Sequence, residues 1–555
     1  MTVSDILLEV LQAHGVEHLF GIAGDAINDV MDAVRRQDAI RYVPVRHEEA
    51  GAFAASAQAK LTGRLAACMG TAGPGAVHLL NGLYDAKLDH APVIAITGQV
   101  ATEFIGTQHH QEVALDRLFA DVAVYSQTVM TPDQVPDVFL EACHAAIAHR
   151  GVAHIALPTN LSGRQVREQR RRPFKAAGAG TISPSAADCQ DAVALIRESQ
   201  KIAILAGVGC AGARDQLIDF AERLQAPIVR SLKAKAVIED DHPLCIGGLG
   251  MLGGRPGVKA MDACDLLIMI GTDFPYRDFY PRQAKTIQID IQPTRIGKRQ
   301  VADVGLVGHA GPTMAKLAAQ LPKREASHFL QNMQHEMEDW RHTQYALERA
   351  DDTPIKPPRA MRALSDIAPD EAIFTCDTGT VTAWSARHLM VRPGQRYILS
   401  GGLASMAFAM PAAIGAQLAF PDRQVFALAG DGAFAMLMGE FLTAVQHELP
   451  IIVLIFNNGK LAFITLEQEA KGLPDWGTKL TNPDFAAVAE ACGGLGLKVR
   501  EPSALAPALQ QAIAARRPTV IDIMVDPDAL IMPPKVSAGQ AVNFGLAKIR
   551  EMLGS

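Results

Sequence analysis

Residues 430–458 read GDGAFAMLMGEFLTAVQHELPIIVLIFNN. The run QVFALA that precedes this stretch and the run IIVLIF inside it are short and apolar, as buried strands are. Between them lie a tight Gly-Asp-Gly turn at 430–432 and a helical pattern from about 434 to 447, which Pro450 ends. We therefore predict a strand, a glycine turn, a helix and a second strand, which together make one unit of a parallel α/β sheet.

Both predicted strands are followed by polar residues, Asp431 and Asn458. In a parallel sheet the carboxyl ends of the strands share one edge, and ligands bind at that edge. A carboxylate and an amide oxygen are suitable ligands for a hard cation such as Mg²⁺. A helix N-terminus and bare glycine N–H groups suit a phosphate. The stretch therefore predicts a site for a magnesium diphosphate.

The spacing of GDG and NN resembles the signature of thiamine-diphosphate-dependent enzymes, and the likeness extends from about residue 5 to 550. The resemblance implies thiamine diphosphate and Mg²⁺ as cofactors. It implies three metal ligands: the side chains of Asp431 and Asn458 and the main-chain carbonyl of Lys460. The cofactor-binding residues implied around the turn are Gly430, Gly432 and Ala433.

The overall composition excludes several other classes of protein. The chain has 555 residues, enough for three domains, and a net charge of −7, which offers nucleic acid no general electrostatic footprint. None of the eight cysteines form a CxxC pair, so we expect neither a zinc site nor a disulfide framework. The N-terminus does not resemble a signal peptide, and the uncharged stretch 401–420 is rich in Ala and Gly, as interior helices are. We expect a cytoplasmic protein without integral membrane contact.

Apolar strands alternate with helical patterns throughout, which predicts an α/β fold of three doubly wound parallel-sheet domains. The predicted domains are 1–165, 184–330 and 355–555, separated by polar tracts. The predicted strands are RYVPV, LAACMG, VIAITG and HIALP in the first domain, KIAILAG, APIVRSL, LLIMIG and TIQIDI in the second, and AIFTCD, QVFALAG, IIVLIFN and TVIDIMV in the third.

The first and third domains share an internal repeat. A Gly-Pro-Gly turn at 73–75 opens a helix, and Pro92 leads into the strand VIAITG. Gly432 opens the corresponding helix in the third domain, and Pro450 leads into the strand IIVLIF after a nearly equal interval. We predict two copies of one fold with a different domain between them, which is also the arrangement of the family that the chain resembles.

Glu48 follows the strand RYVPV directly. An acidic residue in this position often caps the next helix. The resemblance implies that Glu48 lies against the aminopyrimidine of the cofactor, where a buried carboxyl that shares a proton with the ring activates the thiazolium carbon. The glycine turn with Gly73 and Gly75 matches the family turn that lets the backbone approach the ring.

The resemblance also implies that Gln111 lies near the reacting centre. Close relatives carry Phe immediately before this glutamine, whereas this chain has His109-His110. Paired histidines are also found in decarboxylases that release free aldehyde. His110 either makes the pocket more polar and handles protons or merely replaces a wall residue.

Further residues of the third domain match the family. Gly379 and Thr380 follow a strand and resemble a diphosphate loop, while Met406 matches the apolar residue that bends the cofactor. After NN comes a short helix on which Phe463 and Glu467 would face the substrate. Plain core packing for Met406 and a solvated helix face for Glu467 are the alternative interpretations.

The middle domain carries GVGCAG at 207–212, a formal GxGxxG motif, but no acidic residue ends the second strand as an NAD site would require. Its later motifs resemble the FAD-binding domain of pyruvate oxidases and quinone-dependent pyruvate dehydrogenases. The resemblance thus implies FAD as a third cofactor. The residues implied in its binding are Gly207, Gly209, Thr272, Tyr276, Asp290, Ile291 and Asp303.

The resemblance implies oxidative decarboxylation of pyruvate or a close 2-oxo acid, with electrons passing to a quinone, oxygen or another acceptor. A carboligase like acetohydroxyacid synthase, a non-oxidative decarboxylase and a nucleotide-binding scaffold protein are the alternatives. Relatives share each active site between subunits, so we expect a homodimer or a tetramer of paired dimers. Membrane-activated relatives carry an extra amphipathic tail, whereas we expect this chain to end after a mixed-charge helix at 546–555, which leaves peripheral membrane contact open.

Overall fold

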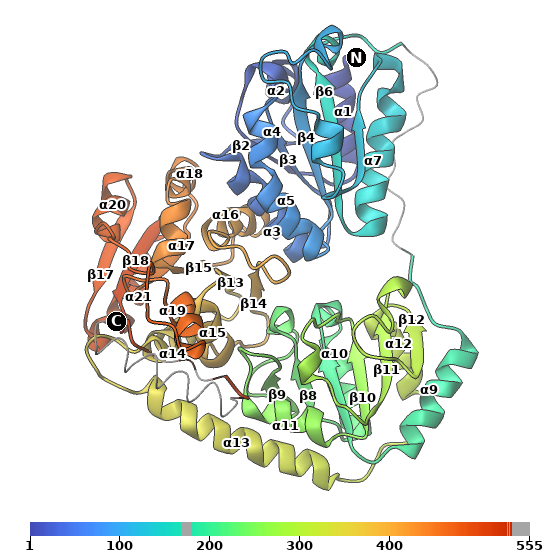
Figure 1. Ribbon diagram of the computed structural model, residues 1–555, viewed down its shortest axis with the longest axis vertical. Coiled ribbons are helices and arrows are strands. Elements are labelled where there is room, and N and C mark those ends of the chain that lie inside the picture. Colours follow the sequence, from blue (N-terminus) through green and yellow to red (C-terminus); the bar gives the residue numbers. More distant parts are fainter. Residues whose placement is uncertain (168–179, 530, 532, 536–555) are drawn as a thin grey trace.

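The computed structural model of the chain describes residues 1–167, 180–529, 531 and 533–535 (Figure 1). They form three sheets of six parallel strands, with helices between the strands. Alternate residues of a strand enter different cores: Cys68 and Ala95 lie in one apolar cluster, and Met69 and Ile96 lie in another. Each face of this sheet is therefore buried, as a doubly wound fold requires. The predicted fold class is confirmed.

The first domain lies at the top of Figure 1. Its sheet has the order β2-β1-β3-β4-β6-β5. The strands are β1 (His18–Gly21), β2 (Arg41–Pro44), β3 (Ala66–Gly70), β4 (Val93–Gln99), β5 (Ala123–Thr128) and β6 (Val152–Pro158). The helices are α1 (Val3–Ala13), α2 (Asn28–Arg35), α3 (Glu48–Thr62), α4 (Pro74–His78), α5 (Leu80–Leu88), α6 (Leu115–Leu118), α7 (Val135–His149) and α8 (Thr159–Ser162).

The middle domain has the sheet order β9-β8-β7-β10-β11-β12, which is the dinucleotide-binding order 3-2-1-4-5-6. The strands are β7 (Ile202–Ala206), β8 (Ile228–Arg230), β9 (Cys245–Gly248), β10 (Leu266–Ile270), β11 (Lys285–Asp290) and β12 (Val304–Val307). The helices are α9 (Ala186–Glu198), α10 (Arg214–Leu224), α11 (Arg255–Ala263) and α12 (Ala310–Ala318), and the long α13 (His328–Glu348) leads to the third domain.

The third domain has the order β14-β13-β15-β16-β18-β17. The strands are β13 (Ile373–Cys376), β14 (Arg396–Leu399), β15 (Val425–Gly430), β16 (Ile452–Asn457), β17 (Leu495–Val499) and β18 (Thr519–Met524). The helices are α14 (Pro357–Ile367), α15 (Thr380–His388), α16 (Ala409–Ala419), α17 (Asp431–Met436), α18 (Glu440–Gln446), α19 (Ala462–Ala470), α20 (Phe485–Ala491) and α21 (Leu505–Ala515).

The outer sheets have the same order, strand for strand, which bears out the internal repeat. One detail of the prediction was wrong. The single helix expected over 434–447 is two helices, α17 and α18, separated at 437–439. The first domain has the same interruption between α4 and α5, so the break belongs to the repeated unit.

Two other predictions meet the structure only in part. Within the uncharged stretch 401–420 the helix begins only at Ala409, where α16 starts. The predicted C-terminal helix at 546–555 lies outside the described residues, as does most of the polar tract between the first two domains.

The first and third domains pack through α3 and α16, which are both rich in small residues. A Cβ added at Gly415 would lie 2.2 Å from the Ala54 carbonyl oxygen, so the two helices meet at backbone distance. An ion cluster then joins all three domains. Lys60 Nζ lies 2.7 Å from carboxylate oxygens of both Asp85 and Asp89, and Asp89 also pairs with Lys233 of the middle domain. Asp89 accepts a hydrogen bond from the Gly401 amide of the third domain.

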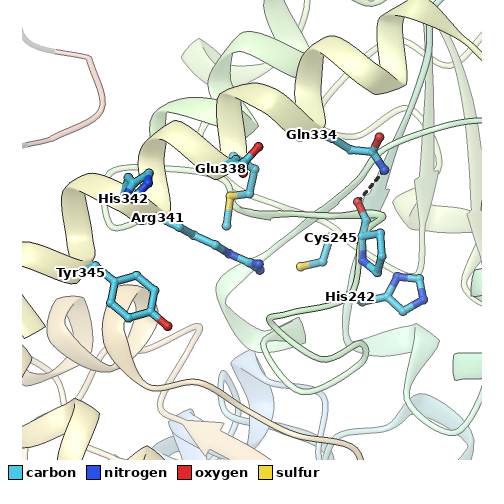
Figure 2. A pocket seen from close by; sticks show the side chains of 9 residues that line it. His242, Cys245, Gln334, Glu338, Arg341, His342 and Tyr345 are labelled. Atoms are coloured by element: carbon cyan, nitrogen blue, oxygen red, sulfur yellow. Dashed lines mark hydrogen bonds between the residues drawn. The ribbon is translucent and has the colours of Figure 1, made fainter.

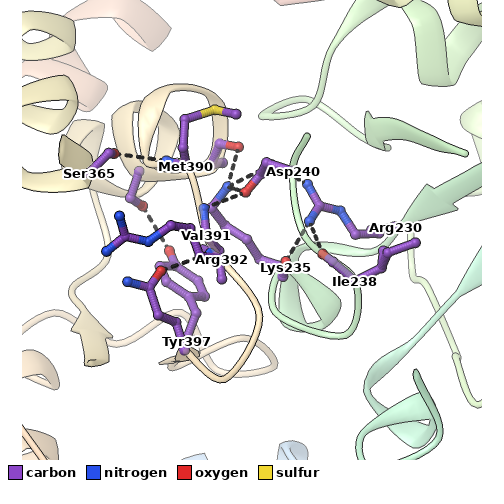
Figure 3. Close-up of polar contacts among 12 residues, drawn as sticks. Arg230, Lys235, Ile238, Asp240, Ser365, Met390, Val391, Arg392 and Tyr397 are labelled. Atoms are coloured by element: carbon purple, nitrogen blue, oxygen red, sulfur yellow. Dashed lines mark hydrogen bonds and ion pairs between the residues drawn. The ribbon is translucent and has the colours of Figure 1, made fainter. Parts of the chain in front are cut away.

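The middle and third domains meet at a buried polar contact centred on Asp240 (Figure 3). Its carboxylate pairs with Arg230 and Lys235 and accepts a hydrogen bond of 2.8 Å from the Val391 amide. Lys235 also donates to the Ala386 carbonyl. Such a network costs free energy when one partner is lost, so it fixes how the two domains meet.

Candidate active site

A cavity of about 320 Å³ lies where the third domain faces the middle domain. Its walls are the carboxyl ends of β15 and β16, the loop before α15, the loop before α16 and the start of α19. The predicted residues that line it are Tyr276, Gly379, Thr380, Met406, Gly430, Asp431, Gly432, Ala433, Asn458, Lys460, Phe463 and Glu467. The structure thus brings together every residue predicted in the third domain.

Asp431 and Asn458 follow adjacent strands, β15 and β16, which is why they lie close together. Asp431 is 2% exposed, and burial raises the pKa of its carboxyl. Its Oδ2 atom accepts hydrogen bonds from the Gly459 amide at 2.8 Å and from Asn482 at 2.6 Å. A cation beside this carboxylate would favour its charged form, so the carboxylate and the amide oxygen of Asn458 fit a Mg²⁺ site.

Asn482 was missed by the sequence analysis. It donates to Asp431 Oδ2 and, at 3.0 Å, to Asn457 Oδ1, whose own amide donates to Asp522. The first asparagine of NN therefore belongs to a buried network behind the site, and only the second lines the cavity. A polar residue 51 positions away in the sequence carries no local signal of this role.

Asp377 lies behind the predicted diphosphate loop. It is 1% exposed, and its Oδ1 accepts a hydrogen bond of 3.0 Å from the Ala409 amide at the start of α16. Burial raises the pKa of Asp377 to about 7. Two positions later, Gly379 has φ 143°, a backbone conformation that favours glycine, and it lines the cavity together with Thr380.

Met406 reaches across the cavity toward the glycine turn, since a Cβ added at Gly432 would lie 3.7 Å from its Cε atom. The residues around it are held in unusual conformations: Ala404 and Ala407 both have positive φ. Opposite them, α19 presents Phe463 and Glu467 to the cavity, with Glu467 exposed to solvent.

The predicted residues of the first domain form a separate group. Glu48 is 6% exposed at the first turn of α3, and its Oε2 lies 2.9 Å from Nδ1 of His78. The His78 ring stacks on the ring of His47 at 4.3 Å. A Cβ added at Gly75 would lie 3.1 Å from Glu48 Oε1, so the glycine turn packs directly on this carboxylate.

The turn that carries Glu48 is held by the third domain. Glu440 is 1% exposed, and its Oε1 accepts hydrogen bonds of 2.9 Å from the amides of Arg46 and His47. Its other oxygen accepts a bond from Thr443. Glu440 was not predicted as a functional residue, because its partners lie some 390 positions away in the sequence.

Gln111 joins the group around Glu48, whereas His110 points to solvent. A Cβ added at Gly73 would lie 3.0 Å from Gln111 Cβ, and Gln111 has φ 62°. The loop is closed by Glu112, whose carboxylate accepts bonds from the amides of Gly106 and His109. These bonds lower the pKa of Glu112. His110 is exposed.

In the middle domain the strand order reverses between β7 and β10, and the predicted glycines lie at that point. A Cβ added at Gly207 would lie 2.1 Å from the Gly271 oxygen, and one at Gly209 would lie 2.6 Å from Gly271 Cα. These glycines therefore allow two turns to pack closely. Thr272 is buried beside them, and its hydroxyl accepts a bond from the Phe274 amide.

Asp290 and Asp303 are not brought together. Asp290 ends β11 at the carboxyl edge, with Ile291 after it, and its carboxylate accepts a bond from the Gln292 amide. Asp303 precedes β12 and accepts a bond from the amide of Thr286 near the start of β11. The two carboxylates thus lie toward opposite edges of the sheet, about four residues or ~13 Å apart along the strand.

The described part of the chain contains no helix long and apolar enough to cross a membrane.

Three family models match the chain, and together they cover most of it. They are the thiamine pyrophosphate enzyme N-terminal TPP binding domain over residues 1–118, the central domain over 189–317 and the C-terminal TPP binding domain over 377–523. The chain belongs to the thiamine-diphosphate-dependent enzymes of the acetohydroxyacid synthase-like superfamily.

Similar proteins align with nearly the whole chain. A putative thiamine pyrophosphate-containing protein, YdaP of Bacillus subtilis, is 40% identical over 98% of this chain and 95% of its own length. The pyruvate oxidase of Lactiplantibacillus plantarum is 34% identical over 97% of this chain and 90% of its own length. A probable acetolactate synthase large subunit of Methanocaldococcus jannaschii is 32% identical over 96% and 93%.

Proposed function

We propose that the protein uses thiamine diphosphate, Mg²⁺ and FAD to decarboxylate and oxidise pyruvate, or a closely related 2-oxo acid, and passes the electrons to an acceptor. One observation carries this proposal. Tyr276, Met251 and Leu232 of the middle domain line the same cavity as Asp431 and Asn458. A flavin held at the carboxyl edge of the middle sheet would therefore lie next to the site of decarboxylation. The similarity to a pyruvate oxidase supports the same function.

The residues of the cavity fit the cofactors by their chemistry. Asp431, Asn458 and the Lys460 carbonyl would hold Mg²⁺, and the loop at 378–380 with the 430–433 turn would bind the diphosphate. When bound, thiamine diphosphate supplies the carbon nucleophile and electron sink for decarboxylation, and FAD supplies the two-electron acceptor. At the carboxyl edge of the middle sheet, Gly207, Gly209, Thr272, Asp290 and Ile291 would contact the flavin dinucleotide.

Side chains of the protein provide the remaining functions. Glu48 would exchange a proton with the pyrimidine, and its burial between α3 and the glycine turn excludes water from that step. Phe463 and Glu467 lie at the cavity wall where a 2-oxo acid would enter, and Gln111 lies on the Glu48 side.

The separation of the two groups of residues supports a homo-oligomer. Glu48, Gly73, Gly75 and Gln111 do not line the cavity of Asp431 in the described chain. We propose that a second copy brings its Glu48 group to this cavity, in a homodimer or in a tetramer of paired dimers. The proposed setting is cytoplasmic.

A carboligase reaction is the second candidate. Acetolactate synthases from three genera are 32–33% identical over almost the whole chain, nearly as similar as the pyruvate oxidase. In that case the flavin would not accept substrate electrons.

An anaerobic absorption spectrum of the protein with thiamine diphosphate and Mg²⁺, before and after pyruvate is added, tests the proposal. We expect the flavin band to bleach as CO2 is released. A band that persists during CO2 release would reject the oxidase function. Acetolactate among the products would then identify a carboligase, and acetaldehyde would identify a simple decarboxylase.

A further inference from the structure

The first asparagine of the NN pair, Asn457, lies outside the cavity described above. It ends β16 and is 5% exposed, and only Asn458 after it lines the cavity. Its side-chain nitrogen donates a hydrogen bond of 2.9 Å to Oδ1 of Asp522 on the neighbouring strand β18. Its side-chain oxygen accepts one of 3.0 Å from Asn482. Both ends of the Asn457 amide are therefore engaged away from the substrate.

Asn482 belongs to an irregular segment that lies beside the loop 458–461, which carries Asn458 and Lys460. Two backbone hydrogen bonds of 2.8 Å join the segment to the loop, from the amides of Leu480 and Leu461 to the carbonyls of Gly459 and Thr478, respectively. Pro483 follows Asn482 and disfavours a helical backbone there. The segment thus brings an asparagine side chain to the back of the candidate metal site.

The Asn482 amide nitrogen uses both of its hydrogens. One bond of 2.6 Å goes to Oδ2 of Asp431, and one of 3.0 Å goes to Oδ1 of Asn457. The same Asp431 oxygen accepts the Gly459 amide at 2.8 Å, so two donors hold this carboxylate. A continuous chain of hydrogen-bonded side chains therefore runs from Asp522 to Asp431.

The far end of this chain fixes the orientation of its amides. An asparagine can present either its nitrogen or its oxygen to a neighbour, and its hydrogen-bond partners decide which. An ionised carboxylate only accepts, so Asp522 selects the nitrogen of Asn457 and leaves the oxygen for Asn482. That oxygen selects the nitrogen of Asn482, which consequently donates to Asp431.

Lys498 favours the ionised Asp522 that this orientation requires. Asp522 is fully buried, and burial raises the pKa of its carboxyl, whereas the bond from Asn457 and the charge of Lys498 lower it. Lys498 Nζ lies 3.8 Å from Asp522 Oδ2 and 2.8 Å from a carboxylate oxygen of Asp484. A positive charge so close to a carboxylate stabilises its charged form.

We propose that Asp522, Asn457 and Asn482 position the Asp431 carboxylate for Mg²⁺ and so raise the affinity of the site for this cation. The inference rests on the proposed Mg²⁺ site. None of the three lines the cavity, so they are positioning residues that act through Asp431. Loss of a hydrogen-bond partner of a metal ligand typically lowers metal affinity about 10–100-fold. The first asparagine of NN thereby has a function distinct from that of the second.

Calorimetric titration of the full-length protein with Mg²⁺, at saturating thiamine diphosphate, tests the proposal. We expect Asn482→Ala to weaken Mg²⁺ binding about tenfold, since Asp431 loses one of its two donors. Asp522→Asn keeps the size of the side chain, but its amide can donate as well as accept and no longer fixes the orientation of Asn457. A smaller loss of about threefold is expected for this variant.

The double variant distinguishes a connected chain from two independent supports. Because Asn482→Ala already interrupts the chain, the addition of Asp522→Asn should cause no further loss of Mg²⁺ affinity. Saturating Mg²⁺ should restore turnover of pyruvate in all three variants, since the chain acts on cation binding and does not contact the substrate.

Gln334→Ala is the matched control. The Gln334 amide donates a bond of 3.1 Å to the Pro243 carbonyl, beside a pocket between α13 and β9 that shares no lining residue with the active cavity (Figure 2). Asp484→Asn is a second control, because it removes a carboxylate that pairs with Lys498 outside the chain. Both variants should leave Mg²⁺ affinity unchanged.

Three outcomes would contradict the proposal. Unchanged Mg²⁺ affinity in Asn482→Ala, or additive losses in the double variant, would overturn it and leave the proposed function intact. If Asn482→Ala does not fold, unchanged affinity in Asp522→Asn has the same meaning. A wild-type protein that binds no Mg²⁺ would overturn the proposed cofactor site together with this inference.

Discussion

The first and third domains arrange their strands in the same order, and in both a central strand ends at a glycine, Gly70 in β3 and Gly430 in β15. The residues that follow differ. In the third domain Asp431 comes next, with its carboxylate at a cavity, whereas in the first domain Thr71 takes that position. The acidic group of the first domain stands instead on the neighbouring helix, as Glu48 against His78.

This difference shows what the shared fold does and does not decide. Both sheets bring strand ends and a glycine turn to one edge, which is where ligands bind in open α/β sheets. The residue types at the edge then divide the work. A carboxylate with amide oxygens suits a cation and its diphosphate, and a buried carboxyl beside an imidazole suits proton exchange.

The first and third domains also stabilise each other's turns through different hydrogen bonds. Glu440 at the start of α18 accepts hydrogen bonds from two backbone amides that lie just before α3 of the first domain. The corresponding helix of the first domain, α5, carries Asn81, which donates to the Ser405 hydroxyl just before α16 at 3.1 Å. Each domain thus supports the turn before the other's packed helix. The support for Glu48 is one buried carboxylate that accepts two amides. The loop that carries Met406 is held by the neutral bond from Asn81 to Ser405 and, at its other end, by the bond from the Gly401 amide to Asp89.

The largest expected effect is on turnover when Glu48 is changed. Glu48→Gln keeps the size of the side chain and removes its exchangeable proton, so turnover of pyruvate should fall about a thousandfold, within the range for general acid–base groups. Affinity for thiamine diphosphate, followed by calorimetry, should change little. Glu9→Gln, on an exposed face of α1, is the control. Undiminished turnover in Glu48→Gln would remove the assignment of proton chemistry to the first domain.

Changing Asp431, the acidic residue of the third domain that corresponds to Glu48, should affect cofactor binding more than catalysis. Asp431→Ala removes the carboxylate that we propose as a Mg²⁺ ligand, and we expect the apparent affinity for Mg²⁺ in the presence of thiamine diphosphate to fall about a hundredfold. Excess Mg²⁺ should restore part of the activity. Asp528→Ala, which removes an exposed carboxylate 3.1 Å from Lys460 Nζ, is the matched control. If Asp431→Ala lowered turnover without changing Mg²⁺ affinity, the division of work between the two domains would be wrong.

A smaller effect should follow from breaking the mutual support. Glu440→Ala leaves two backbone amides without their acceptor, at a cost of about 1–3 kcal/mol, and turnover should fall about tenfold through misplacement of Glu48. Glu440→Gln retains an acceptor oxygen and should restore most of the activity, while cofactor affinity stays unchanged in both variants. Asn81→Ala removes the bond to Ser405 and a bond of 2.6 Å to Glu49 Oε1, and it should cost no more than about threefold, since both acceptors are only partly buried. Equal losses in Glu440→Ala and Asn81→Ala would show that the two supports do not differ.

The sequence predicted the central strands of the sheets better than their edges. Twelve strands were expected and the described residues form eighteen. Five of the six missed strands are edge strands, namely β5, β9, β12, β14 and β17. Edge strands are partly exposed, so their apolar runs are short and interrupted, as in β17, where only Val499 is buried. The sixth, β1, is fully buried but only four residues long.

The residues of the candidate site, too, could be predicted from the sequence only in part. Asp431 and Asn458 could be predicted because they end consecutive strands, whose carboxyl ends must share an edge. Asn482 and Glu440 could not, because each contacts the site from an irregular or distant segment and looks like an ordinary polar residue in the sequence. Tyr276 was expected at the flavin, and its place on the wall of the same cavity as Asp431 depends on how two domains pack.

The smallest expected effect concerns Asp377, whose buried carboxylate faces the start of α16. Burial raises its pKa in the folded protein to about 7, above the value of 3.8 for an unperturbed aspartate. The stabilisation from its protonated form is therefore complete below the unfolded pKa and is lost as the pH rises through about 7. We expect the unfolding free energy of the wild type to fall by about 1–3 kcal/mol between pH 5 and pH 8 for this reason.

Asp377→Asn should remove that part of the pH dependence, because the amide is neutral throughout and its oxygen can still accept the Ala409 bond. The midpoint of urea unfolding, measured at both pH values, is the test, and Asp422→Asn on the exposed turn before β15 is the control. Turnover should change little, since Asp377 faces α16 and not the cavity. An equally steep pH dependence in Asp377→Asn would mean that the Asp377 carboxylate is already ionised in the folded state and that α16 is anchored by a charged group.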